Sequence, residues 1–225
     1  MFFLLKNLKY LAGFNSLIIF ARKIICMEIK DKIISNSGKL FFKYGIRNIT
    51  MDAIAEDLGI SKRTIYENFK DKDELLTYCL EANTLEQNKI VDEILNNSEN
   101  LIEALIKIIK HNVNTLKLIN PVFYFDVQKY YYELFEVKIK KNRKKNLTRI
   151  SDILNRGIQE KIFRSEINVE IVALLILEQF KMMGNQEIFP ENKFSKVEIF
   201  ENIAINFIRG LATNEGLIML GKYNS

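Results

Sequence analysis

The chain has 225 residues, of which 48% are apolar, and its formal net charge at neutral pH is +5. This length and composition are enough to bury a core and to build one small and one larger domain. With one histidine, His111, no glycine-rich phosphate loop and no metal-type spacing of cysteines, the sequence argues against an enzyme, a cofactor and a bound metal.

The first 26 residues form an extension with a character of its own. They contribute four of the five net positive charges, because they hold no acid and four basic residues, Lys6, Lys9, Arg22 and Lys23. Their apolar stretch, 10–21, is shorter than the about 20 residues that span a bilayer, and no small-residue cleavage site follows it. A start assigned too far upstream, an interfacial helix, and a signal or anchor are the alternatives, and a membrane partner is expected only if the extension is genuine.

Residues 49–75 have the pattern of two short helices around a glycine turn, followed by the start of a third helix. Thr50 can cap the first helix, Gly59 suits the left-handed residue that ends it, and Ser61 can cap the second. Ile65 and Phe69 lie four apart on one face of the second helix and can pack on the first. The unit is therefore either a helix-turn-helix DNA reader or an ordinary helical hairpin with a charged face.

The opposite face of the second helix carries polar, aromatic and cationic side chains. At about 100° per residue, Arg63 points away from Ile65, and Tyr66 lies on the flank. Side chains of these types at the start of a recognition helix reach base edges and phosphates. The set that suits this role is Lys62, Arg63, Thr64 and Tyr66.

The sequence of this segment resembles the DNA-binding domain of the TetR family of bacterial transcriptional regulators. The family pattern is an apolar helix ending in F-x-x-x-G, then T-x-x-x-I-A-x-x-x-G-[VI]-S-x-x-T-[IL]-Y-x-x-F-x-x-K-x-x-L. The matching residues are Phe41, Gly45, Thr50, Ile54, Ala55, Gly59, Ile60, Ser61, Thr64, Ile65, Tyr66, Phe69, Lys72 and Leu75. Two positions depart from the commonest pattern: Arg63 stands where a small residue is frequent, and Asn68 where histidine is frequent.

The resemblance implies a double-stranded DNA operator as partner and a set of DNA contacts. These contacts are Thr50, Lys62, Arg63, Thr64, Tyr66 and Lys72, with Thr50 and Lys72 on phosphates and the residues after Ser61 nearest the bases. Arg63 could bind guanine through a bidentate fork, so this departure bears on sequence preference and not on DNA binding itself.

Apolar residues at helical spacing, with only two prolines and nine glycines, predict an all-α chain. The expected organisation is an N-terminal extension over 1–26, a three-helix helix-turn-helix domain over 27–72, and a larger helical regulatory and dimerisation domain over 73–225. In the larger domain the caps and breakers predict helices over 71–95, from 101, from Pro121, over Val169–Met183 and over Ser195–Leu211.

An aromatic segment at 123–135 has two interpretations. Aromatic walls with a few polar tips are typical of an effector pocket, and the family often contacts its ligand in this part of the chain. The alternative is a tightly packed aromatic core. The residues expected to contact a small-molecule effector are Phe123, Phe125, Tyr130, Tyr131 and Phe135.

The last two long helices are predicted to be broadly apolar. The stretch Val169–Met183 is apolar almost all round, so it must be covered on more than one side. The resemblance implies that two such helices from each of two subunits form a four-helix homodimer interface, although both could merely close the monomer core. The expected interface residues are Leu174, Leu177, Phe200, Ile203 and Phe207.

These observations favour a sequence-specific DNA-binding regulator, which the resemblance makes a ligand-responsive dimeric repressor. The alternative is a helical interaction module of the same shape that has lost DNA binding. Cys26 and Cys79 do not suggest a disulfide framework, so a reducing cytoplasm is the expected compartment.

Overall fold

The computed structural model describes residues 27–223, so the predicted extension over 1–26 lies outside the described residues. Helices dominate the described part, and its one β-type pairing is an isolated bridge between Phe163 and Ala212. The prediction of an all-α chain is confirmed. Contacts divide the described chain into two units, one of residues 27–41 and 48–83 and one of 42–47 and 84–223. The predicted domain limit at residue 72 stays a prediction.

A helix spans residues 27–44, and all of it except its last turn belongs to the first unit. The unit continues with α2 (Met51–Leu58), α3 (Lys62–Asn68) and the start of α4 (Lys72–Asn97). Its caps follow the sequence. The Thr50 hydroxyl accepts a hydrogen bond from the Ala53 amide at 3.1 Å, and Ser61 accepts one from the Thr64 amide at 3.0 Å. Gly59 ends α2 with φ of 64°, a left-handed conformation that favours glycine.

The core of the first unit is built from the buried faces of these helices. Its fully buried side chains include Ile33, Phe41, Ile54, Ile65, Phe69 and Leu75. As predicted, Ile65 and Phe69 point inward, so the other face of α3 is left outside the core. The Lys30 ammonium lies 4.1 Å from the ring centre of Tyr78, which itself meets Phe69 edge to face.

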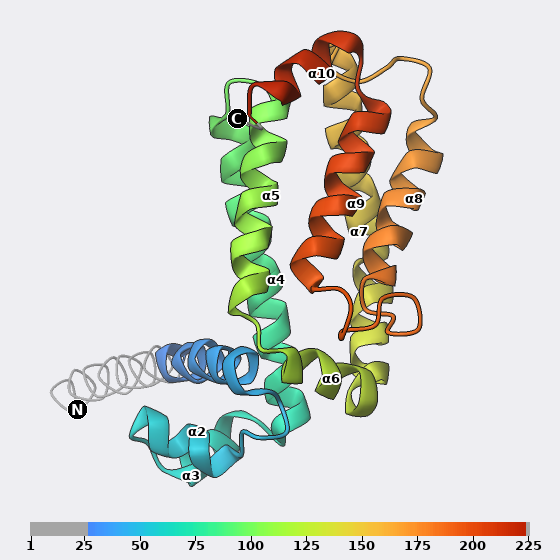
Figure 1. Ribbon diagram of the computed structural model, residues 1–225. Coiled ribbons are helices and arrows are strands. Elements are labelled where there is room, and N and C mark those ends of the chain that lie inside the picture. Colours follow the sequence, from blue (N-terminus) through green and yellow to red (C-terminus); the bar gives the residue numbers. More distant parts are fainter. Residues whose placement is uncertain (1–26, 224–225) are drawn as a thin grey trace, which may run out of the picture. The chain divides into compact units, whose positions relative to one another are not determined.

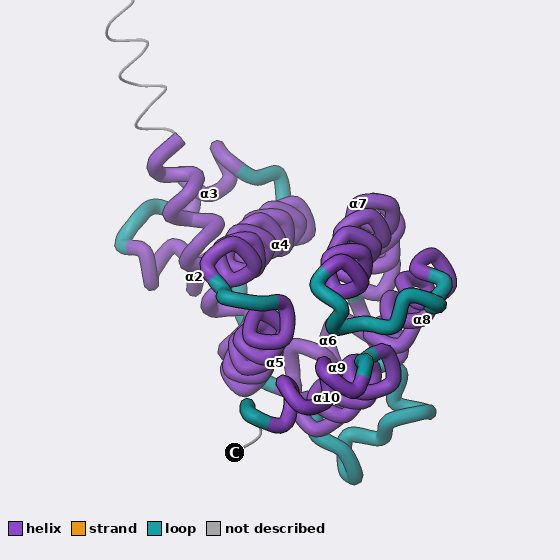
Figure 2. The backbone as a smooth tube through the Cα atoms, turned by 90° about the horizontal axis from the view of Figure 1, so that it is seen from above, coloured by secondary structure: helices purple, strands orange, loops and turns teal. Residues whose placement is uncertain are grey.

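The second unit is a helical bundle. Beyond α4, its elements in chain order are α5 (Leu101–Leu118), α6 (Pro121–Tyr130), α7 (Tyr132–Gln159), α8 (Val169–Met182), α9 (Lys196–Leu211) and α10 (Asn214–Gly221). Figures 1 and 2 show α5, α7, α8 and α9 side by side along the bundle, with α10 across one end and α6 at the other. The two apolar helices predicted at 169–183 and 195–211 therefore exist, within one residue at an end.

The bundle core joins α5 to the C-terminal helices. Its centre is fully or almost fully buried and includes Leu101, Ile102, Ala104, Leu154, Ile162, Phe163 and Ala173. None of the described helices is both long enough and apolar enough to cross a membrane.

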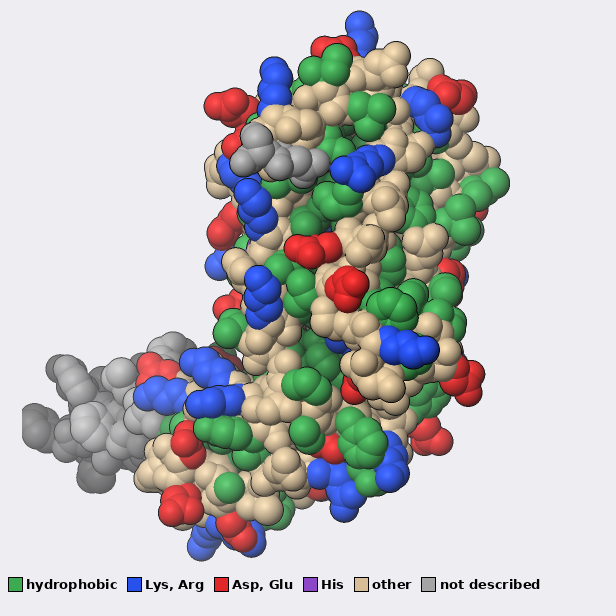
Figure 3. Space-filling model, in the orientation of Figure 1, with side chains coloured by type: hydrophobic (Ala, Val, Ile, Leu, Met, Phe, Trp, Pro, Cys, Tyr) green, Lys and Arg blue, Asp and Glu red, His purple; other side chains and the backbone are tan. Residues whose placement is uncertain are grey.

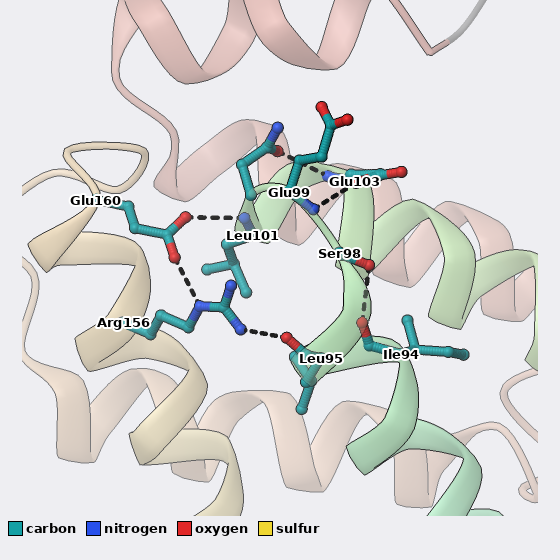
Figure 4. A network of polar contacts seen from close by, with 9 residues as sticks. Ile94, Leu95, Ser98, Glu99, Leu101, Glu103, Arg156 and Glu160 are labelled. Carbon is teal, nitrogen blue, oxygen red and sulfur yellow. Dashed lines mark hydrogen bonds and ion pairs between the residues drawn. The ribbon is translucent and has the colours of Figure 1, made fainter.

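A polar network ties the turn between α4 and α5 to the end of α7 (Figure 4). Glu160 accepts a hydrogen bond from the buried Leu101 amide at 2.8 Å and pairs with Arg156 at 2.6 Å. Arg156 also donates to the Leu95 carbonyl at 2.7 Å. One salt bridge thus satisfies an amide at the start of α5 and a carbonyl near the end of α4, groups that the helices themselves leave unpaired.

Candidate nucleic-acid interface and ligand cavity

The exposed face of α3 carries the side chains expected to read DNA. The Arg63 side chain is 87% exposed and Tyr66 is 47% exposed, whereas Ile65 between them is fully buried. The buried Ile65 anchors α3 in the core. The outer side of the helix therefore presents Lys62, Arg63 and Tyr66 to solvent. This arrangement agrees with the sequence prediction for these residues.

Both cations of this face form exposed ion pairs with nearby carboxylates. Lys62 pairs with Asp52 of α2 at 2.7 Å, and this hydrogen-bonded contact raises the pKa of Lys62. Arg63 pairs with Glu67, one turn further along α3, at 2.8 Å. Exposed pairs of this kind contribute little to stability, because water screens both charges. Both cations can therefore exchange their carboxylates for phosphate oxygens or a base edge at small cost.

The remaining predicted DNA contacts also have partners in the structure. The Thr50 hydroxyl uses a lone pair as the cap of α2, so its proton is still able to donate to a phosphate. The Thr64 and Ser61 hydroxyls lie 2.8 Å apart. Lys72 lies 5.9 Å from the ring centre of Phe41. Asn68 donates to the Thr64 carbonyl at 2.8 Å, which keeps its amide on its own helix.

The segment Phe42–Arg47, which comprises the end of the first helix and the turn after it, belongs to the second unit and is held by α6. The buried carboxylate of Asp126 accepts a hydrogen bond from the Arg47 amide at 2.8 Å, and the Arg47 guanidinium lies 4.2 Å from the ring centre of Tyr130. Asn120 donates to the Phe42 carbonyl at 2.9 Å through its backbone and to the Lys43 carbonyl at 3.1 Å through its side chain.

Gly45 is required in the middle of that segment. Its φ is 87°, and a β-carbon there would lie 2.6 Å from a methyl group of Val122. Backbone conformation and close approach to α6 both favour glycine. The glycine of the F-x-x-x-G pattern therefore marks the point where the chain passes closest to α6.

The five aromatics expected to contact an effector do not share one environment, because some are buried and others are exposed. Phe123 is 4% exposed and packs against Phe42 and Phe135, with ring centres 4.9 and 6.1 Å apart. Phe125 and Tyr130 are each 44% exposed, with ring centres 6.2 Å apart, and Tyr131 is half-buried at the C-terminal end of α6. For Phe123 the alternative interpretation, an aromatic core, describes its position.

A cavity of about 350 Å³ lies elsewhere in the second unit, between α5, α7, α8 and α9. None of the five predicted aromatics lines it, and Phe135 lines a different groove, beside α8. The walls of the cavity are apolar except for Asn112 of α5. They comprise Leu105, Ile108, Ile109, Asn112, Ile150, Ile153, Leu154, Phe163, Ile176, Phe180, Phe200, Ala204, Phe207, Ile208 and Leu211. Sequence reasoning missed this site.

Tyr124, the neighbour of Phe123, gives a pH-dependent prediction. Its buried hydroxyl has no hydrogen-bond partner within residues 27–223, and burial raises its pKa to about 12. A raised folded-state pKa gives a stability contribution that is complete below the unfolded pKa near 10 and is lost as the pH rises toward 12. Tyr124→Phe should therefore be at least as stable as the parent in urea unfolding at pH 8, because it removes an unpaired buried hydroxyl, and should lose less stability between pH 10 and 12. Equal alkaline losses in both proteins would contradict this.

The predicted dimer residues do not all reach the surface. Phe200 is only 8% exposed and lies against Phe180 in the core, so little of its side chain is available for a dimer contact; the broad apolar stripe of α9 includes its inward side. Ile203 and Phe207 line a groove of about 760 Å³ between α8 and α9. Leu174 and Leu177 are half-buried on α8.

The surface over α8 is strongly apolar for a helix at the edge of a bundle. Ile171 and Leu175 are 55% and 51% exposed, and Ala173 alone among the residues of α8 is fully buried. Figure 3 shows apolar side chains at the surface in this region. As expected, α8 is covered on more than one side, by α7 and by α9, but its face with Ile171 and Leu175 stays exposed within the described chain.

A helix-turn-helix unit with a cationic reading face, followed by a helical bundle around a cavity, defines a DNA-binding regulator. Residues 33–79 match the sequence profile described as bacterial regulatory proteins, tetR family. An HTH-type transcriptional regulator of Staphylococcus aureus (strain USA300) is 29% identical over 126 residues, covering 48% of this chain and 68% of that protein. Residues 33–79 therefore form a TetR-type DNA-binding domain, and the chain is similar to HTH-type transcriptional regulators.

Solved structures share the fold over most of the chain. A transcriptional regulator from Cytophaga hutchinsonii superposes with a TM-score of 0.66 at 21% identity, over 81% of this chain and 98% of that one. The regulator FadR from Bacillus subtilis, in complex with stearoyl-CoA, superposes with a TM-score of 0.58 at 19% identity, over 80% of this chain and 97% of that one. The fold of the second unit is therefore that of these regulators.

Proposed function

We propose that the protein is a homodimeric repressor that occupies a near-palindromic operator and leaves it when a small molecule binds in the second unit. The observation that carries the DNA-binding part is the outer face of α3, where Arg63 and Tyr66 project from a helix anchored by the buried Ile65. We infer no catalytic role, and an operator as the target places the protein in the cytoplasm.

The contacts divide by role. We propose that Thr50, Lys62 and Lys72 hold phosphates, together with the Thr64 hydroxyl. Tyr66 lies beside them on the exposed flank of α3 and contacts the backbone as well. Arg63 is the base reader, because its guanidinium is the most exposed cation of α3 and only the exposed Glu67 carboxylate competes for it. A guanidinium fork binds the O6 and N7 atoms of guanine.

A gel-shift titration at fixed salt tests this division, using the DNA that flanks the gene of the protein. Tyr66→Ala and Lys72→Ala should each weaken binding about tenfold on every bound sequence, the effect of losing about 1.4 kcal/mol of phosphate contacts. Arg63→Ala should relax the preference for one base pair by about 1–3 kcal/mol and should weaken other sites less.

Lys145→Ala is the matched control for Lys72→Ala and Arg63→Ala. Lys145 is an exposed cation on α7, and its replacement removes one positive charge, as those two substitutions do. It should bind like the parent. Unchanged affinity in the Tyr66, Lys72 and Arg63 variants would reject the proposed DNA contacts and favour the alternative, an interaction module without DNA binding.

Dimerisation is supported by the apolar surface of α8 and α9. We propose that Leu174, Leu177, Ile203 and Phe207, with the exposed Ile171 and Leu175, meet the same residues of a second copy. A twofold pair places two copies of α3 about 34 Å apart, one turn of DNA. Light scattering at micromolar concentration should give twice the chain mass of 26.4 kDa, and a mass of one chain would contradict the dimer.

A small-molecule effector is supported by the interior cavity, whose size falls in the range of about 300–1,000 Å³ found for ligand sites. FadR of Bacillus subtilis is a regulator of this fold whose structure holds stearoyl-CoA. We propose the cavity as the effector site in place of the aromatic segment at 123–135. Release from DNA requires that the effector bind the DNA-free form more tightly than the complex, and equal affinity for both would contradict regulation.

A further inference from the structure

The cavity between α5, α7, α8 and α9 has a lining that selects the chemistry of its occupant. We infer that it binds an uncharged, mainly apolar molecule of about twelve non-hydrogen atoms with one hydrogen-bonding group, which Asn112 receives. This inference rests on the proposed function only in taking the cavity as the effector site. The ligand class itself follows from three properties of the walls: their charge, their one polar group and their volume.

The walls carry no charge. Within the described part of the chain, no Lys, Arg, His, Asp or Glu lines the cavity. Lys107, on the same helix as Asn112, is not in the lining and pairs with Glu103 at 2.8 Å. A carboxylate or ammonium group entering here would lose its water and find no counterion, which is strongly unfavourable.

Aromatic rings do not alter this conclusion for cations. Phe163, Phe180, Phe200 and Phe207 belong to the lining, and ring faces can attract an ammonium group. However, Phe180 and Phe200 pack against each other, with centres 5.4 Å apart and planes inclined by 34°. The Phe180 and Phe200 rings thus partly cover each other, and no carboxylate of the described residues lines the cavity to strengthen the attraction of a cation to the rings.

Asn112 is the one polar side chain of the lining, and its amide can donate two hydrogen bonds and accept two. Among residues 27–223, no protein group hydrogen-bonds that amide. Asn112 is half-buried and its amide borders the cavity, where a ligand hydroxyl, carbonyl or amide can take the place of water as its hydrogen-bond partner. Because the amide both donates and accepts, it recognises a polar group without requiring charge.

The volume limits the size of the occupant. At roughly 30 Å³ for a water-sized group in a liquid, about 350 Å³ holds about twelve such groups. A ten-carbon chain with one small head group meets this limit.

Three ten-carbon probes that differ in head-group charge test the inference: 1-decanol, decanoate and decylammonium. Each is titrated into the full chain by calorimetry, below its aggregation concentration and without DNA. Decanol should bind at least tenfold more tightly than either ion. Asn112→Leu should lower decanol affinity about tenfold, whereas Asn114→Leu, an exposed amide two residues along the same helix, should leave it unchanged.

A substitution that fills the cavity tests whether the probe binds there. Ala204→Phe should abolish decanol binding while circular dichroism shows a folded helical protein; if this variant does not fold, Ile108→Phe replaces it, since Ile108 also lines the cavity. Binding that survives in the folded, filled variant would overturn the site.

Equal or tighter binding of decanoate or decylammonium would overturn the ligand class, and unchanged decanol affinity in Asn112→Leu would overturn the role of the amide. These results would leave effector regulation intact. Decanol that binds as expected without lowering operator affinity would instead count against the proposed regulation while supporting the ligand class.

Discussion

Replacing Gly157 with alanine is expected to destabilise the chain by about 3 kcal/mol, at the upper end of the cost of overpacking a core. A β-carbon at this position would lie 2.1 Å from Cδ2 of Phe163 and 2.9 Å from Cδ2 of Leu101. Both neighbours are buried, at 3% and 0% exposure, so neither can move aside without opening the core. Thermal unfolding should show a midpoint lower by roughly 6–12 °C for a chain of this size.

Gly38→Ala is the matched control for that substitution. Gly38 is also a buried glycine inside a helix, but a β-carbon there would meet only Cβ of Cys79, at 3.7 Å, an ordinary contact. Alanine should therefore raise stability by about 0.5–1 kcal/mol, the usual gain within a helix. Equal midpoints for the two variants would show that close packing at Gly157 is not what holds α7 against Phe163.

Glu160→Leu is expected to cost about 2–3 kcal/mol, because it removes the acceptor of the buried Leu101 amide and the carboxylate partner of Arg156 together. Glu160→Gln keeps an oxygen that can accept from the Leu101 amide, so it should cost about 1 kcal/mol. Urea unfolding at pH 7 measures both.

The order of the two variants is the critical result. If Gln and Leu are equally destabilising, the charge of Glu160 matters and the capping of α5 does not. If neither lowers stability, the network shown in Figure 4 contributes nothing to holding the α4–α5 turn against α7.

Local features of the fold could be predicted from the sequence because each depends on a few neighbouring residues. Thr50 and Ser61 cap helices as expected, and Gly59 takes the left-handed conformation that the turn requires. The outward direction of Arg63 followed from helical geometry. These properties are fixed within one or two helical turns, so no tertiary information was needed.

The cavity could not be predicted because its walls come from four helices that are far apart in the chain. Periodicity predicted broadly apolar helices, including the one that carries Phe207, but not that their apolar faces leave space between them. Asn112 carried no local signal, since an asparagine within a helix is more often exposed. The aromatic segment drew attention by its density, yet Phe123 packs against Phe42, which the sequence placed in the other domain.

The contacts of Phe42–Arg47 have a consequence for hybrid regulators. An exchange of residues 27–83 for the reader of a relative would bring in a foreign segment at 42–47, while Asn120 and Asp126 would remain with the recipient. The buried carboxylate of Asp126 would then face an amide placed by another sequence. A functional transplant should therefore carry α6 together with the DNA-binding unit, or retain residues 42–47 of the recipient. For modular exchange the boundary that matters is this six-residue segment, and not the peptide bond after residue 83.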